Sequence, residues 1–105
     1  MEITSFDNQY VKRVASLHKK KYRDEYKEFF VEGIKTIEEA IKYNQKIKNI
    51  FYCPDMLEYK LENPAYKVTK EVISKMADTS TPQGIIAVCE VPEGELKDKN
   101  KKATE

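Results

Sequence analysis

The chain has 105 residues, of which 40% are hydrophobic and 10% aromatic, so it is long and apolar enough for one domain with a buried core. A mean hydropathy of −0.72 excludes a membrane protein, and no apolar run approaches the roughly 20 residues that span a bilayer. The first residues carry neither the basic nor the apolar segment of a signal peptide, so we expect a cytoplasmic location.

Basic residues are concentrated near the start of the chain. Six of the 19 cations lie between Val11 and Arg23, where there is no acid, so the remaining 13 are outnumbered by 18 acids elsewhere. The six are Lys12, Arg13, Lys19, Lys20, Lys21 and Arg23. Positive charge gathered in one segment attracts polyanions, which makes this segment the first candidate for function.

Apolar residues in this segment recur at steps of three and four, which predicts a helix with one buried stripe made of Tyr10, Val11, Val14, Ala15 and Leu17. At about 100° per residue, the opposite side carries Lys12, Lys19 and Arg23, flanked by Arg13 and Lys20. We expect Ser5 or Asp7 to cap the helix and the helix to end or bend near Lys21. A solvated outer face would also carry cations, but such faces usually include acids as i,i+4 partners.

Strand and helix signals then alternate along the chain. Residues 22–27 indicate a charged connector or a short helical turn. Strands are predicted at residues 29–31, 47–53, 66–68 and 85–89, and helices at 34–41, 55–61 and after Thr69, which can act as a cap. The continuously apolar run 85–89 is typical of a strand covered on both faces. The predicted fold class is α/β, a three-layer α/β/α sandwich around a small sheet of about four strands, whose order the sequence leaves open.

Residues for catalysis are scarce. The one histidine, His18, lies beside the apolar stripe, where we expect a structural role. Cys53 and Cys89 are expected to be buried, reduced thiols. Three glycines leave no glycine-rich loop for phosphates. No reaction centre can be assembled from these residues, so the sequence indicates a binding module without catalytic residues or a metal site.

Two groups of residues carry a family resemblance. The first comprises Ile3-Thr4-Ser5, Asn8, Val11-Lys12, Leu17, Lys20-Lys21-Tyr22-Arg23, Phe30-Val31-Glu32-Gly33 and Glu39-Ala40. The second comprises Val72-Ile73-Ser74-Lys75-Met76 and Thr79-Ser80-Thr81-Pro82-Gln83-Gly84-Ile85. Together they resemble the N-terminal substrate-binding domain of SpoU (TrmH-type, SPOUT superfamily) RNA 2′-O-ribose methyltransferases over about residues 3–91.

The resemblance implies an RNA substrate-binding domain over residues 1–92, with a fold like that of ribosomal protein L30e. Residues 93–105 would begin an interdomain linker or form a tail. In the family a knotted methyltransferase domain follows, which binds S-adenosylmethionine and usually dimerises. The motifs of that catalytic domain have no counterpart before Glu105. We therefore expect a fragment cut within the linker, inactive alone and without a cofactor of its own.

The expected partners are RNA, with ribosomal RNA as the leading class, and the protein's own C-terminal methyltransferase domain, with no membrane partner. The parent would be a homodimer and the fragment a monomer. The candidate RNA-binding residues are Asn8, Lys12, Arg13, Lys19, Lys20 and Arg23; for Asn8 a helix-capping role is an open alternative. Tyr22 and Tyr26 are candidates for stacking on unpaired bases. Two other functions stay open, a stand-alone L30e/L7Ae-like ribosomal or kink-turn RNA-binding protein and a protein–protein docking domain.

Overall fold

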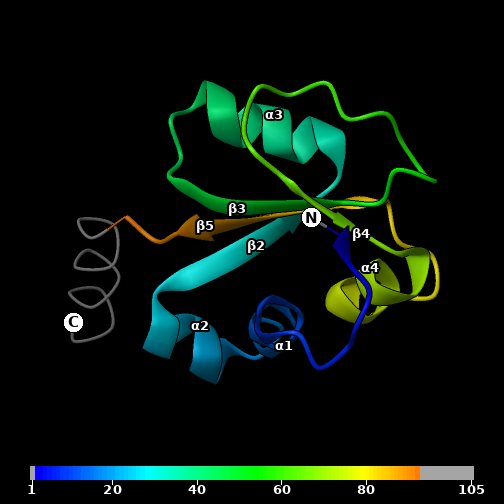
Figure 1. Ribbon diagram of the computed structural model, residues 1–105. Coiled ribbons are helices and arrows are strands. Elements are labelled where there is room, and N and C mark those ends of the chain that lie inside the picture. Colours follow the sequence, from blue (N-terminus) through cyan, green and yellow to red (C-terminus); the bar gives the residue numbers. More distant parts are fainter. Residues whose placement is uncertain (1, 93–105) are drawn as a thin grey trace, which may run out of the picture.

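The computed structural model describes residues 2–92, which form five strands and four helices (Figure 1). The strands are β1 (Glu2–Ile3), β2 (Glu28–Glu32), β3 (Ile47–Tyr52), β4 (Tyr66–Val68) and β5 (Ile85–Glu90). The helices are α1 (Gln9–Ser16), α2 (Lys20–Tyr26), α3 (Ile34–Lys42) and α4 (Lys70–Ala77). The predicted linker or tail, residues 93–105, lies outside the described residues.

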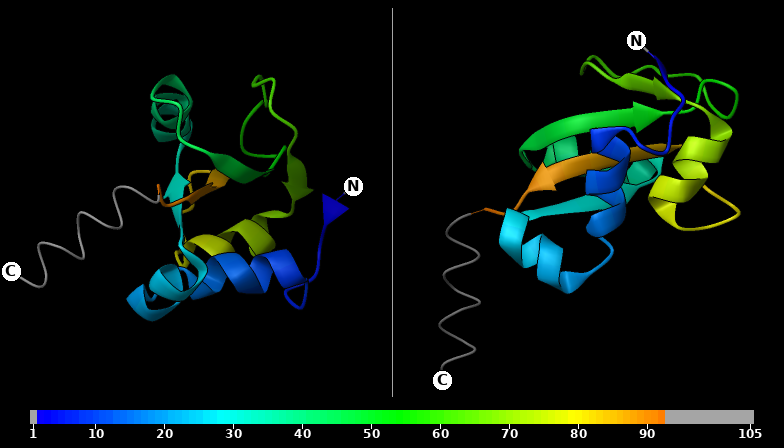
Figure 2. Two further views of the ribbon diagram at one scale, coloured as in Figure 1. Left: turned by 90° about the vertical axis from the view of Figure 1, so that its left-hand side faces the viewer. Right: turned by 60° about the horizontal axis from the view of Figure 1, so that its bottom comes forward.

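The strands form one mixed sheet in the order β1-β4-β3-β5-β2. β4 runs parallel to both β1 and β3, whereas β5 runs antiparallel to both β3 and β2. Helix α3 covers one face of this sheet, and α1, α2 and α4 cover the other (Figures 1 and 2). The predicted α/β class with helices on both faces is confirmed, but the sheet has five strands rather than about four. The additional strand, β1, has two residues, too few to show a period in the sequence.

Strand β5 holds the two layers of the core together. Ile86 and Val88 pack in the cluster beneath α1 and α4, while Ile85 and Ala87 pack in the cluster beneath α3. Successive side chains of a strand point to opposite faces, which explains why this run is continuously apolar, as predicted. Cys89, at its end, is a buried free thiol, and burial raises its pKa to about 11.

The predicted helix over residues 55–61 is wrong. Leu57, Tyr59 and Leu61 all pack beneath α3 from an irregular segment, and the residues between them are exposed. Burial at every second position is the pattern of an extended chain. The Leu57–Leu61 spacing fits a helical stripe as well, and the intervening Tyr59 decides between the two.

The basic segment forms two helices, so the predicted bend is present, but it lies at residues 17–19 rather than at Lys21. Helix α1 ends at Ser16, whose Oγ donates a hydrogen bond of 2.6 Å to the Arg13 carbonyl. After it, Lys19 adopts an extended backbone conformation that starts α2 in a new direction. Contacts from elsewhere in the fold fix this corner: the His18 ring packs on Phe30, with centroids 4.6 Å apart. Its Nε2 lies 2.8 Å from the carbonyl oxygen of Met76.

No helix in the described part of the chain combines the length and apolar character required to cross a membrane.

Candidate nucleic-acid interface

Helix α1 is fixed on the sheet by one face and leaves the other to solvent. Val11, Val14 and Leu17 are buried in the cluster that α1 shares with α4. Asn8 caps the helix, because its Oδ1 accepts a hydrogen bond of 2.8 Å from the Tyr10 N–H. Neither Ser5 nor Asp7 has this role, so the predicted cap is wrong. The structure thus confirms the capping role that was an open alternative for Asn8.

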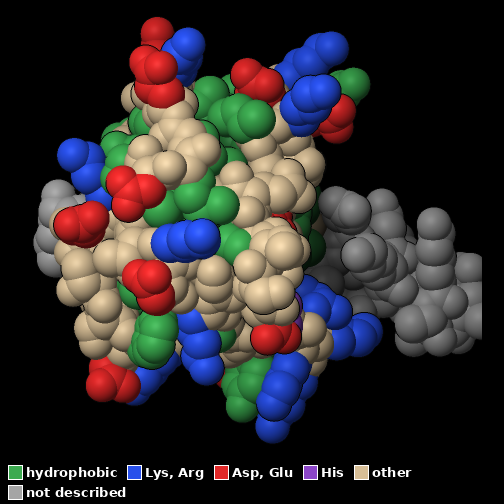
Figure 3. All heavy atoms as spheres, turned by 90° about the vertical axis from the view of Figure 1, so that its right-hand side faces the viewer, with side chains coloured by type: hydrophobic (Ala, Val, Ile, Leu, Met, Phe, Trp, Pro, Cys, Tyr) green, Lys and Arg blue, Asp and Glu red, His purple; other side chains and the backbone are tan. Residues whose placement is uncertain are grey.

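Basic side chains are unevenly distributed over the surface. On the face shown in Figure 3, acidic and basic side chains alternate over the upper part, while basic side chains gather at the lower right. The lower part of this view is the layer of α1, α2 and α4 in Figure 1. The candidate interface therefore lies in this layer.

The two arginines of the basic segment are held by the protein. Arg23 Nη1 donates hydrogen bonds to the carbonyl oxygens of Leu17 (3.0 Å) and His18 (2.9 Å). These carbonyls lie just beyond the end of α1, where backbone acceptors lack helical partners. Arg23 thus stabilises the corner between α1 and α2.

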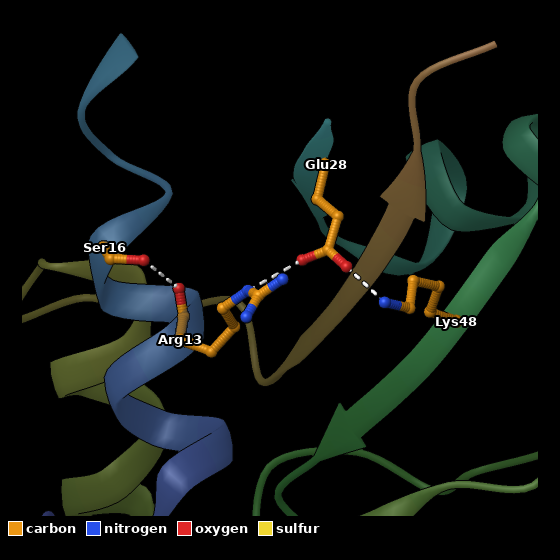
Figure 4. Close-up of polar contacts among 4 residues, drawn as sticks. All are labelled: Arg13, Ser16, Glu28 and Lys48. Atoms are coloured by element: carbon orange, nitrogen blue, oxygen red, sulfur yellow. Dashed lines mark hydrogen bonds and ion pairs between the residues drawn. The ribbon is translucent and has the colours of Figure 1, made fainter. Parts of the chain in front are cut away.

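Arg13 belongs to an ionic cluster around a buried carboxylate, which we call the Glu28 cluster and which consists of Arg13, Glu28 and Lys48 (Figure 4). Glu28 is 3% exposed, and its Oε1 accepts a hydrogen bond of 3.0 Å from Arg13 Nε. Lys48 Nζ binds the other carboxylate oxygen. The Arg13 guanidinium also lies 3.4 Å from the centroid of the Tyr26 ring. Because each charge in the cluster has a partner, the cost of burying the carboxylate is offset.

A register shift brings Lys48 into this cluster. Ile47 and Asn49 of β3 pair with the adjacent residues Cys89 and Val88 of β5, so Lys48 between them has no partner of its own. Such irregularities redirect a side chain. The sequence does contain one sign of this cluster. Glu28 lies two positions before Phe30, which packs against the core, so both side chains share one face of β2.

Three lysines surround a groove on the outer side of α1, which we call the lysine groove. It has a volume of about 330 Å³ and is lined by Phe6, Val11, Lys12, Ala15, Ser16, Lys19, Tyr22 and Lys75. Lys12, Lys19 and Lys75 are exposed and form no ion pair with any residue that the structure describes. None of the described residues lining the groove is acidic. The groove therefore presents positive charge that the fold does not neutralise.

Two of these lining residues were missed from the sequence. Lys75 comes from α4, far from the basic segment in the chain, and joins Lys12 and Lys19 only in the folded protein. Phe6 lies outside the helical stripe and is 51% exposed. Its one signal was a large aromatic residue in a polar loop before the helix.

The remaining cations lie at the start of α2. Lys20 pairs with Asp24 at 2.6 Å, and both side chains are exposed. Lys21 lies 5.5 Å from the centroid of the Tyr22 ring. Lysines in a first helical turn oppose the helix dipole, and α2 has no acid there. Apart from the Lys20–Asp24 pair and the Lys21–Tyr22 contact, these lysines therefore add positive charge at the start of the helix.

Neither of the two glycines within residues 2–92 lines a phosphate cradle. Gly33 and Gly84 both have positive φ, but they are packed against side chains rather than lining a cradle; a Cβ at Gly33 would lie 2.3 Å from Gln83 Oε1. Within residues 2–92 there is no group of three His, Cys, Asp or Glu side chains placed to hold a metal ion.

Comparisons with known proteins give the family. Residues 8–87 match the MRM3-like substrate binding domain. Over 100 residues the chain is 36% identical to the 23S rRNA (guanosine(2553)-2′-O)-methyltransferase RlmP of Bacillus subtilis (strain 168), covering 90% of this chain and 40% of that protein. The chain thus spans about 40% of the length of this curated relative.

Solved structures agree with this match. An RNA 2′-O ribose methyltransferase superposes with a TM-score of 0.77 at 28% identity, over 89% of this chain and 38% of that one. An rRNA methyltransferase from Sinorhizobium meliloti gives 0.72 at 29% identity, over 88% and 37%. An rRNA methyltransferase from the same organism has been solved with AdoMet bound. The family match extends from the cap of α1 into β5, and the chain therefore belongs to the MRM3-like substrate-binding domains of the SpoU/TrmH RNA 2′-O-methyltransferases.

Proposed function

We propose that this chain is the RNA-recognition domain of an AdoMet-dependent RNA 2′-O-ribose methyltransferase and that its target is 23S rRNA. The single observation that carries the proposal is the lysine groove, where three lysines without acidic partners line one concave surface. Membership of a substrate-binding family supports the role, and the similarity to RlmP supports ribosomal RNA as the substrate.

The structure suggests a division of roles among the candidate RNA-binding residues. Lys12 and Lys19, together with Lys75, would contact phosphates, and Lys20 would add charge beside them. Asn8, Arg13 and Arg23 would act indirectly, because each is engaged in contacts within the protein. Three phosphate contacts predict a log–log salt slope of about −2, at 0.7 per phosphate of a single strand.

The chemistry would be supplied by a tethered methyltransferase domain. We propose that AdoMet binds there, that the present chain alone is inactive, and that the parent is a cytoplasmic homodimer. No catalytic step is assigned to the residues that the structure describes. An L30e-like arrangement, expected from the family resemblance, is part of the same proposal.

The test is binding of a 23S rRNA fragment that contains position 2553, measured by fluorescence anisotropy across a salt series. The double variant Lys12→Glu/Lys19→Glu should lose affinity by about tenfold or more, because it removes two phosphate contacts and adds repulsion. The matched control is Lys35→Glu/Lys60→Glu, which makes the same change in net charge at exposed positions of the α3 layer.

If RNA binds specifically at the lysine groove, the control variant Lys35→Glu/Lys60→Glu should keep most of its affinity for the rRNA fragment. Equal losses in both double variants would contradict the proposed surface, because the effect would follow net charge alone. Binding that is independent of salt would contradict RNA backbone contact altogether and would favour the protein-docking alternative.

A further inference from the structure

The lysine groove contains an exposed aromatic side chain that the core does not use. Phe6 is 51% exposed and belongs to neither hydrophobic cluster of the described residues. Its turn is fixed from both sides, since the Asp7 N–H donates to Ser5 Oγ at 3.1 Å and the Asn8 N–H donates to the Ser5 carbonyl at 3.3 Å. The Phe6 ring is therefore exposed to solvent on a turn that is held by hydrogen bonds.

A second ring, that of Tyr22, lines the same groove from α2. It stacks on Tyr26 with centroids 5.9 Å apart and an interplanar angle of 22°. Tyr26 in turn lies beneath the Arg13 guanidinium of the Glu28 cluster. This chain of contacts holds Tyr22 in place before any ligand arrives, which lowers the entropic cost of stacking.

We propose that the lysine groove holds one unpaired nucleotide of the RNA, with its base in contact with both the Phe6 and the Tyr22 ring and its flanking phosphates at Lys12, Lys19 and Lys75. This inference rests on the proposed function and specifies the substrate as single-stranded. Aromatic side chains bind unpaired bases through their π faces, whereas a base inside a duplex offers no free face. The volume of about 330 Å³ lies at the lower end of small-molecule pockets, which suits one nucleotide.

The experiment compares two probes, a short unstructured RNA and the same strand paired with its complement, each bound to the 105-residue chain. Phe6→Ala should weaken binding of the single strand by about 5- to 150-fold, the range for removing one stacked base, and leave duplex binding nearly unchanged. Phe6→Leu is the matched control for apolar area and should lose nearly as much, because leucine has no π face. Phe6→Trp should retain affinity.

Tyr22 provides an independent arm. Tyr22→Phe keeps the ring and should retain affinity, whereas Tyr22→Ala should not, with far-UV circular dichroism used to verify folding. A 2-aminopurine base in the single strand should be quenched on binding to the original chain and less so on binding to Phe6→Ala. All phosphate contacts remain in these variants, so the salt slope should not change.

The outcomes separate this inference from the proposed function. Wild-type affinity for the single strand in both Phe6→Leu and Phe6→Ala, or equal losses on both probes, would overturn the stacking site. If Lys12→Glu/Lys19→Glu still loses affinity in that case, the proposed RNA surface stands without it. If the lysine variant also binds normally, both proposals fail.

Discussion

The basic segment contains two kinds of cation that the sequence alone makes look alike. Arg13 and Arg23 donate to a buried carboxylate and to backbone carbonyls, whereas Lys12 and Lys19 are exposed beside a groove without acids. A guanidinium can bond several acceptors in a fixed plane and stack on a ring, which suits contacts within a fold. The lysine ammonium group, on its flexible side chain, is well hydrated and can remain in water without a loss of stability. The comparison shows how structural cations can be told apart from cations that are available to a ligand. Residue type and burial make the distinction, and position in a charged run does not.

The largest effect should come from the acid that holds Arg13. Glu28→Gln removes the charge shared by Arg13 and Lys48, and we expect a loss of about 2–3 kcal/mol in the free energy of unfolding. This is less than for a fully buried pair, because both cations are about 40% exposed. Urea unfolding followed by circular dichroism measures it. Glu25→Gln, at an exposed position of α2, is the control and should change stability by less than about 0.5 kcal/mol.

A smaller effect is expected at the corner between α1 and α2. Arg23→Lys keeps the charge but cannot reproduce the two hydrogen bonds to Leu17 and His18, so it should cost about 1–2 kcal/mol of stability. RNA affinity of the folded variant should change by less than about twofold. The reciprocal change, Lys12→Arg, should leave stability unaltered. A stable Arg23→Lys with impaired RNA binding would reverse the roles assigned to the two kinds of cation.

The smallest effect concerns the lysine that the sequence run does not contain. Lys75→Ala should reduce the magnitude of the salt slope of RNA binding by about 0.7, the contribution of one phosphate on a single strand. Its stability should stay within about 0.5 kcal/mol of the original chain. Lys70→Ala, on the same helix but outside the groove, serves as the control. The same loss of slope in both variants would show that α4 contributes diffuse charge rather than a contact.

Sequence patterns predicted those elements in which the buried residues are either continuous or regularly spaced. The run at β5 and the helix capped by Thr69 were both read correctly, because continuous burial and a 3.6-residue stripe leave a direct trace in the residues. The sequence predicted a break near Lys21, but its position after Ser16 left no such trace. It depends on contacts of His18 with Phe30 and Met76, which are distant in the sequence.

The candidate site was predictable only in part, for the same reason. Lys12 and Lys19 could be placed on an outer helical face from their spacing alone. Whether a cation on that segment is paired depends on Glu28, which reaches Arg13 across the fold, and on Lys75, which arrives from α4. A list of charges in sequence order contains neither relationship.

The Glu28 cluster has a consequence for the proposed complex. Arg13 and Lys12 are neighbours on α1, so fixing one side chain against the sheet also sets the direction in which the other projects. Helix α1 would then bind the nucleic acid as a rigid element, because its orientation is already fixed in the folded domain. An approaching strand would need to adapt its own shape to the protein, and discrimination between targets would lie in how readily each RNA makes that adjustment.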